Sequence, residues 1–435
     1  MDLNRRQQSE VLFGDRLQSN VPAFSVANPL CLLSSTCGGA TAAIPVDADL
    51  LSKHFLLLGG IGTGKTNALY HIISQISSKL TSEDVMVIFD TKGDFYKEFY
   101  KSGDVVISND HTATGASGAD YWNIFEEIDQ NDRFMENIIE ISKAIFAEAC
   151  EKTNQIFFPN AAKDIFMAIL YHMATVLPKE KQTNKNLLSF ISGATAPILR
   201  DLLNKYDAFR AMTSYISIDE SPQTQGVLSQ LQQVVREVLI GNFAQHGSLG
   251  LRSLVRAKGG RRIFIEYDLG AGAMLSPIYS LMFDMAIKEA LCRDRSAGNV
   301  YFICDEFKLL PHLKHIDDAV NFGRSLGIKF MIGIQNVEQI YENYGEERAR
   351  SILSGFSTSF CFRVNDAKSR EYIQELFGRN QKIETYLPKM QKNGIVETQR
   401  EGNVVEDWDI LHLETGEAIV GLPGQEPFRF RFTKY

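Results

Sequence analysis

The feature that most constrains the fold of this chain is a glycine-rich segment, GGIGTGKT, at residues 59–66. It fits the pattern G-x-x-x-x-G-K-[ST], follows the apolar run FLLL at 55–58 and precedes a stretch with helical spacing. Glycines allow a tight turn in which successive N–H groups point at phosphate oxygens, and the positive end of a following helix adds to that attraction. The segment therefore predicts a strand, a phosphate-binding loop and a helix.

Two polar side chains at the end of this loop have predicted roles in nucleotide chemistry. Lys65 is expected to reach the β- and γ-phosphates of ATP, and Thr66 to be a ligand of Mg²⁺. ATP and Mg²⁺ are therefore the expected cofactors. The residues expected to surround the phosphates are Gly59, Gly60, Ile61, Gly62, Thr63, Gly64, Lys65 and Thr66.

An acidic pair later in the chain supports this interpretation. The run NVYFICDEF at 299–307 places Asp305 and Glu306 directly after five apolar or aromatic residues. Asp305 is expected to help bind the nucleotide and to hold Mg²⁺, and Glu306 to orient and deprotonate the attacking water. A solvated acidic pair at a turn is the alternative, but the phosphate-binding loop favours a site for ATP hydrolysis.

Two further polar residues are candidates for the same site. Gln335 ends the apolar run KFMIGIQ, where an adjacent strand would place it near the γ-phosphate. Arg324 precedes that run and could stabilise transition-state charge on the ATP of a neighbouring subunit. A surface arginine at a helix end is the commoner outcome for this pattern, so the sequence pattern leaves the role of Arg324 open.

The pattern of apolar residues changes twice along the chain. Short apolar runs at 54–59, 85–90 and 104–109 are typical of strands buried on both faces of a parallel sheet, and such runs resume from residue 262. Between them, apolar residues recur at three- and four-residue steps, as in helices. The predicted fold is α/β: a P-loop (RecA-like) nucleotide-binding domain with a central, mostly parallel sheet and an inserted all-helical domain. The predicted boundaries are an N-terminal segment at 1–50, the first part of the nucleotide-binding domain at 51–125, the helical insertion at 126–255 and the second part of the nucleotide-binding domain at 256–435.

Composition narrows the possible classes of protein. With 44% hydrophobic and 23% charged residues the chain is an ordinary globular protein, and its net charge of −8 leaves room only for a local DNA-binding surface. No apolar run reaches the roughly 18 residues of a membrane span. The six cysteines are scattered without a C-x-x-C pair. A reducing, cytoplasmic location is expected.

The sequence leaves the roles of Asp90 and of one basic segment open, and it predicts no functional role for two histidines. Asp90, in DTKGDF, lies either beside the phosphates or in an ordinary strand-exit turn. The basic segment LRSLVRAKGGRR at 251–262 either contacts phosphate backbones or is a solvated helix end. His312 and His315 lack further ligands nearby and are predicted to be surface residues.

Taken together, these motifs resemble those of type IV coupling proteins of the TraG/TraD group. The similarity runs from about residue 44 to the end, with similar order and spacing. The matching segments are IPVDADLLSKHFLLLGGIGTGKT, VIFDTKGDF, YWNIF, FFPNAAKDIF, RRIFIEYDL, ICDEFKLLPHL, GRSLGIKFMIGIQNVEQIYENYG and TSFCFRV.

The resemblance implies an ATPase that carries an all-helical domain between its two nucleotide motifs and is related to ring motors of the FtsK–HerA class. Members assemble as hexamers and pump single-stranded DNA or effector proteins towards a secretion channel. Lys65, Thr66, Asp305 and Glu306 match the two nucleotide motifs. Arg324 and Gln335, which lie 19 and 30 residues after Asp305, match a trans-acting arginine and a sensor glutamine.

Two hypotheses follow for the function. In the first, the chain is an ATP-driven motor that translocates DNA in conjugation or type IV secretion. It would be cytoplasmic, without a membrane span of its own, and would reach the inner face of the membrane through partners such as a relaxase or secretion-channel proteins. In the second, it is an ATP-gated platform that recruits protein substrates without moving DNA. A small-molecule kinase is disfavoured, since the Asp305-Glu306 pair suits the activation of water.

Overall fold

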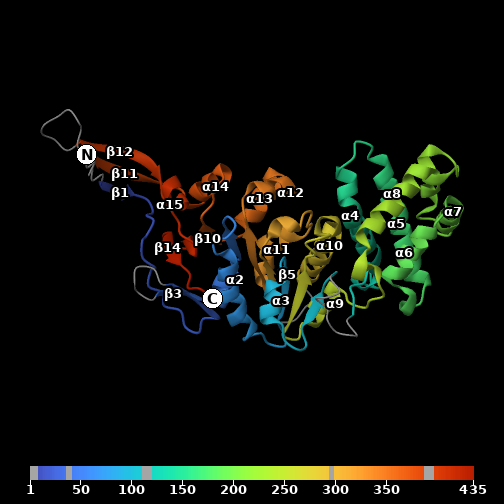
Figure 1. Ribbon diagram of the computed structural model, residues 1–435, viewed down its shortest axis with the longest axis horizontal. Coiled ribbons are helices and arrows are strands. Elements are labelled where there is room, and N and C mark those ends of the chain that lie inside the picture. The colour runs from blue at the N-terminus through green and yellow to red at the C-terminus, as the bar shows by residue number, and fades with distance from the viewer. Residues whose placement is uncertain (1–7, 36–41, 110–119, 293–297, 387–395) are drawn as a thin grey trace. The chain divides into compact units, whose positions relative to one another are not determined.

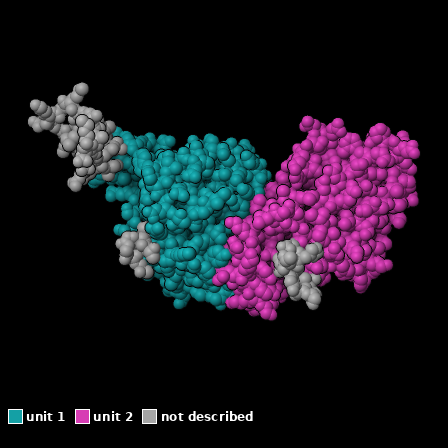
Figure 2. Space-filling model, viewed as in Figure 1, with its two compact units in different colours: residues 1–79, 302–308, 329–435 teal, residues 80–301, 309–328 magenta. Residues whose placement is uncertain are grey.

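The computed structural model describes residues 8–35, 42–109, 120–292, 298–386 and 396–435. The chain divides into two compact units, each built from separate stretches of sequence (Figure 2). Unit 1 comprises residues 1–79, 302–308 and 329–435, and unit 2 comprises residues 80–301 and 309–328.

A mostly parallel sheet forms the core of unit 1. Its strands are hydrogen-bonded in the order β14-β13-β10-β4-β9-β8. β4 runs parallel to both β10 and β9, with Leu58 opposite Cys361 and Ile334, while β13 and β14 run antiparallel at the edge. Every residue of β4, β9 and β10 is buried, as expected for strands covered on both faces. The strands are β4 (Phe55–Leu58), β8 (Val300–Cys304), β9 (Ile328–Ile334), β10 (Thr358–Phe362), β13 (Glu417–Gly421) and β14 (Phe428–Arg431).

Helix α2 (Lys65–Ser77, labelled in Figure 1) follows β4 in the chain. One face of this helix is buried. Its buried apolar residues recur at three- and four-residue steps, which is the spacing that the sequence predicts for this helix. The other helices of unit 1 are α1 (Ala48–Leu51), α12 (Glu338–Tyr344), α13 (Glu346–Ser354), α14 (Ala367–Phe377) and α15 (Asp407–Leu411). Two small antiparallel sheets pair β2 (Cys31–Ser35) with β3 (Ala42–Val46), and β11 (Arg379–Tyr386) with β1 (Gln8–Phe13) and β12 (Val396–Asn403).

Unit 2 contains three parallel strands and most of the helices. The strands β5 (Val85–Asp90), β7 (Arg261–Glu266) and β6 (Val105–Ile107) pair in that order. Between residues 126 and 255 every element is an α- or 3-10 helix. The α-helices are α3 (Asp94–Phe99), α4 (Phe134–Glu151), α5 (Phe157–Val176), α6 (Asn184–Gly193), α7 (Ala196–Asn204), α8 (Pro222–Val238), α9 (Leu251–Ala257), α10 (Gly272–Ala290) and α11 (Ile316–Phe322). None of the helices in the described parts of the chain is long and apolar enough to cross a membrane.

Buried ion pairs join the helices of unit 2. The guanidinium of Arg252, on α9, is 2% exposed and lies 3.3 Å from the Glu289 carboxylate of α10. Arg256 contacts Asp129 at 2.9 Å and Glu289 at 3.0 Å. Arg262 pairs with Asp104 at 2.9 Å. Because these arginines already neutralise buried carboxylates, the segment 251–262 serves mainly to hold unit 2 together.

His315 belongs to a second charged cluster of unit 2, and the prediction that it is a surface residue is wrong. Its Nδ1 lies 2.9 Å from the Asp284 carboxylate and its Nε2 lies 3.7 Å from Glu140. Burial alone lowers the pKa of His315, but the hydrogen bonds with Asp284 and Glu140 raise it to about 9. Lys288 neutralises Glu140 from the other side, with its Nζ 2.6 Å from that carboxylate. His315 is therefore a structural cation of this unit.

Replacing His315 with glutamine is expected to lower the free energy of unfolding by about 1.5–3 kcal/mol near neutral pH or below, the range typical of hydrogen bonds to charged groups. The folded-state pKa, about 9, exceeds the ordinary value of 6.5. The stabilising contribution is therefore complete below the ordinary value and is lost as the pH rises through the folded-state value. Urea unfolding of the wild type and the variant on both sides of this range measures the effect.

A matched control is His312→Gln, since His312 faces only the exposed Glu151, at 3.4 Å, among the ion pairs of the described residues. This control is expected to change stability much less than His315→Gln near neutral pH or below. A difference between wild type and His315→Gln that grew towards alkaline pH would contradict the assignment of His315 as a cation paired with Asp284 and Glu140.

Candidate nucleotide-binding site

The loop at residues 59–64 connects the end of β4 to the start of α2 in unit 1. Gly62 and Gly64 have φ angles of +72° and +115°, which favour glycine. A Cβ on Gly59 would lie 2.5 Å from the Cβ of Phe362, and a Cβ on Gly64 would lie 2.9 Å from the Cα of Gly416. The glycines are thus required by backbone conformation and by close packing on two other segments of the unit.

Lys65 is the first residue of α2 and is 8% exposed. Its ammonium group donates hydrogen bonds to the carbonyl oxygens of Gly59 and Gly60, the latter at 3.1 Å. Thr63 donates from its hydroxyl to the same Gly60 oxygen at 2.8 Å. In contrast, Ile61 is 82% exposed. The loop is therefore folded around the lysine, while Ile61 and Gly62 are exposed.

The structure brings the two predicted metal ligands together. Thr66 donates from Oγ1 to Oδ2 of Asp305 at 2.9 Å. Asp305 directly follows β8 and is 8% exposed. A hydroxyl and a carboxylate at this distance are a suitable oxygen pair for Mg²⁺, which prefers one or two carboxylates together with phosphate oxygens. The donor set therefore fits the expected metal.

Glu306 and Gln335 also meet. The Gln335 amide donates to Oε2 of Glu306, while Oε1 of Glu306 is buried without a hydrogen-bond partner among the described residues. Burial raises the pKa of Glu306, against the opposing effects of Gln335, Lys308 and Lys65. A carboxylate with a raised pKa is a better proton acceptor, so the geometry suits a general base oriented by an amide.

The approach of these two side chains depends on the packing of their strands. Gly333 lies in β9, and a Cβ at that position would come within 2.3 Å of the Asp305 carbonyl oxygen. A glycine is therefore needed for the ends of β8 and β9 to approach this closely.

The remaining candidates lie in unit 2. Arg324 is exposed on a short 3-10 helix, Gly323–Leu326, just before β9. Asp90 accepts hydrogen bonds from the backbone N–H groups of Tyr96, at 2.8 Å, and Lys92, at 3.3 Å. This carboxylate therefore forms the turn after β5, which favours the strand-exit interpretation. Lys65, Thr66, Asp305, Glu306 and Gln335 all belong to unit 1.

The sequence analysis missed three residues that hold the loop in place. Gly60 donates from its N–H to the carbonyl oxygen of Arg363 at 2.9 Å, and Gly416 donates to that of Thr63 at 2.8 Å. Phe362 packs beneath Gly59. The run TSFCFRV predicts a strand and the glycine of LETGEA a turn, but neither pattern indicates contact with a loop some 300 residues away.

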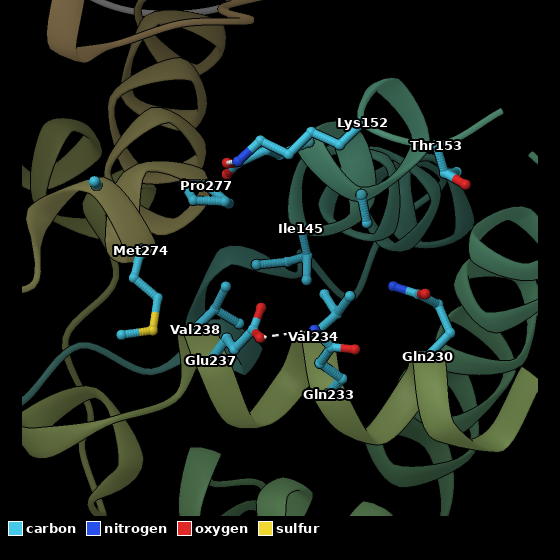
Figure 3. A pocket seen from close by; sticks show the side chains of 13 residues that line it. Ile145, Lys152, Thr153, Gln230, Gln233, Val234, Glu237, Val238, Met274 and Pro277 are labelled. Atoms are coloured by element: carbon cyan, nitrogen blue, oxygen red, sulfur yellow. Dashed lines mark hydrogen bonds and ion pairs between the residues drawn. The ribbon is translucent and has the colours of Figure 1, made fainter. Parts of the chain in front are cut away.

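Unit 2 has a separate cavity of about 490 Å³ between α4, α8 and α10 (Figure 3). Its wall includes apolar side chains and a glutamate, Glu237, that accepts a hydrogen bond from Gln233 at 2.9 Å. None of the predicted site residues lines it. No group of three or more histidine, cysteine or acidic side chains among the described residues is placed to bind a metal ion. The nucleotide motifs therefore remain the best-supported site.

The fold has close counterparts among solved structures. The bacterial conjugative coupling protein TrwBdeltaN70, in its unbound monoclinic form, superimposes with a TM-score of 0.75 at 19% sequence identity, covering 97% of this chain and 93% of that chain. The plasmid coupling protein TrwB in complex with ADP and Mg²⁺ superimposes with a TM-score of 0.74 at 18% identity, covering 100% and 95% of the two chains. The predicted RecA-like α/β fold is confirmed.

Sequence comparison agrees with the fold. Coupling protein TraD of Escherichia coli K12 is 22% identical over 397 residues, which cover 88% of this chain. The chain spans about half of that relative, 53% of its length. The family model of the type IV secretion-system coupling protein DNA-binding domain matches residues 39–429. The chain therefore belongs to the family of type IV secretion-system coupling proteins.

Proposed function

We propose that this chain is an ATPase motor that moves DNA in conjugation or type IV secretion. The observation that carries the proposal is the 2.9 Å hydrogen bond between the Thr66 hydroxyl and the Asp305 carboxylate, which joins the two nucleotide motifs in one site. Its immediate neighbours are Lys65, within the phosphate-binding loop, and Glu306, held by Gln335. Membership of the coupling-protein family supports the link to DNA.

The residues of this site fit ATP and Mg²⁺. The N–H groups of the glycine loop and the Lys65 ammonium would bind the phosphates, and Thr66 and Asp305 would hold the metal. Mg²⁺ held by these two residues would neutralise negative charge that develops on the phosphates during hydrolysis. The relative TrwB was solved in complex with ADP and Mg²⁺, which supports the same assignment here.

Glu306 and Gln335 supply the hydrolytic chemistry in this proposal. The Glu306 carboxylate accepts a proton from the attacking water, and its raised pKa makes it a stronger acceptor than an ordinary glutamate. The Gln335 amide fixes the orientation of that carboxylate through its hydrogen bond. Arg324, which is exposed in unit 2, would reach the ATP of a neighbouring subunit and stabilise the charge on the transferred phosphate.

Such a trans-acting arginine requires an oligomer, and we propose a hexameric ring with single-stranded DNA as its cargo. A relaxase or secretion-channel proteins would be its partners, and through them the motor would act at the inner face of the membrane from the cytoplasm. Arg252, Arg256 and Arg262 are engaged with carboxylates, so the contacts with DNA come from other residues.

One observation favours the platform hypothesis as a second candidate. Three arginines of the basic segment 251–262, Arg252, Arg256 and Arg262, form internal ion pairs, and the net charge is −8. A protein of this kind could use ATP binding to recruit protein substrates without gripping DNA. The nucleotide site would be the same in both candidates, so only the response to DNA separates them.

Glu306→Gln is expected to lower the rate of ATP hydrolysis by about 10²–10⁴-fold, the usual contribution of a general base, while ATP still binds. The substitution keeps the shape of the side chain and removes its ability to accept a proton. Steady-state turnover and nucleotide binding are measured on the same preparation. Lys65→Ala, which removes the ammonium group from the loop, is the matched variant and should lose turnover and ATP binding together. Normal turnover in Glu306→Gln would remove the role assigned to this residue.

The motor hypothesis predicts that DNA raises the ATPase rate. The rise should be steeper at higher protein concentration, since the site is completed by a second subunit, and it should fall with added salt because phosphate contacts release counterions. Hydrolysis is measured with and without single-stranded and duplex DNA, with Lys65→Ala as the blank. A rate that responds to neither DNA would favour the platform.

A further inference from the structure

Arg363 lies at the edge of the sheet where the phosphate-binding loop begins. It directly follows β10, which runs parallel to β4 with Cys361 opposite Leu58. The carboxyl ends of parallel strands meet at one edge of a sheet, and ligands of open α/β sheets bind there. Arg363 and the loop that starts at Gly59 therefore share this edge.

Backbone contacts fix Arg363 beside the lysine end of the loop. The N–H of Gly60 donates to the Arg363 carbonyl oxygen at 2.9 Å, and the carbonyl oxygen of Gly60 accepts from the Lys65 ammonium at 3.1 Å. Gly60 is thus hydrogen-bonded both to the main chain of Arg363 and to the side chain of Lys65. Since a lysine at this position of the motif reaches the β- and γ-phosphates, the main chain of Arg363 would lie near the terminal phosphates of a nucleotide bound in this loop.

The guanidinium of Arg363 is available for a ligand. Arg363 is exposed, whereas all five residues of β10 before it are buried. Its guanidinium has no hydrogen bond, ion pair or ring contact with any residue in the described part of the chain. Many other arginines of unit 1 are already paired with carboxylates. These are Arg350, Arg370, Arg379, Arg400, Arg429 and Arg431.

The charge of the site also calls for a further cation. Within unit 1, Lys308 and Lys65 are the cationic neighbours of Glu306. A bound nucleotide adds several negative charges to those of Asp305 and Glu306, and Mg²⁺ would neutralise only part of them. The planar fork of an arginine matches the geometry of phosphate oxygens and can donate two parallel hydrogen bonds. Among the residues of unit 1 given a role at the nucleotide above, none is an arginine.

We propose that Arg363 binds the terminal phosphate of the nucleotide held by its own subunit. This inference rests on the proposed function, because it assumes that the loop binds ATP. It differs from the role given to Arg324, which acts on a neighbouring subunit. Arg363 is joined to the loop by a backbone hydrogen bond of unit 1, so its contact with the nucleotide does not depend on assembly.

The test compares the affinities of the wild type and Arg363→Ala for ADP and for a non-hydrolysable ATP analogue, both with Mg²⁺, by titration calorimetry at low protein concentration. Arg363→Ala is expected to bind the analogue about 10- to 100-fold more weakly, the equivalent of a lost charge-assisted hydrogen bond, with ADP little affected. Arg363→Lys should recover only part of the loss, since lysine lacks the planar fork.

Arg379→Ala is the matched control, because Arg379 is another exposed arginine of unit 1, and its ion pair with Glu401 lies on the small β11-β12 sheet. It should bind both nucleotides like the wild type. Equal losses for ADP and the analogue in Arg363→Ala, or no loss, would overturn the inference, as would weaker DNA binding with unchanged nucleotide affinity. A wild type that bound neither nucleotide would overturn the proposed function and this inference together.

Discussion

The parallel pairing of β4 with β9 and β10 is the constraint on which the site depends. β4 is followed by the phosphate-binding loop, β9 by Gln335 and β10 by Arg363, so a common direction brings all three to one edge. A register shift of one residue would turn every side chain of a strand to the opposite face. Both faces of these strands are buried, so an alternation of buried and exposed residues does not set their register, and the pairing of the whole sheet must do so.

Close contact between backbones is the second requirement of this arrangement. Gly333 allows β9 to approach the carbonyl of Asp305, and Gly59 and Gly64 allow the loop to rest on Phe362 and Gly416. These approaches are possible because glycine has no Cβ atom. The catalytic side chains can then meet without strain, since the distance between their strands has already been set by the main chain.

Much of the fold and of the site could be predicted from the sequence, because both depend on local patterns. Apolar runs predict buried strands, and the spacing of the loop predicts the positions of Lys65 and Thr66. The structure brings Glu306 and Gln335 together at the ends of adjacent strands, while the position of Gln335 near the γ-phosphate stays a prediction. Long-range contacts are different: nothing local to His315 indicates Asp284, and nothing local to Arg363 indicates Gly60. For the basic segment 251–262, the acidic partners lie far away in sequence, so pattern alone could not separate an ion-pair network from a phosphate-binding surface.

The hydrogen bond from Gly416 to Thr63 has a consequence for the order in which the protein is made. Gly416 also accepts a hydrogen bond from Phe432, so the loop is held by a segment synthesised more than 350 residues later. During translation the glycine loop leaves the ribosome long before these partners exist. Contacts between residues so far apart in the sequence form late and slowly, since the intervening chain must lose conformational entropy before the contacts can form. The nascent chain therefore completes the contacts that hold its phosphate-binding loop only after Gly416 and Phe432 have been made.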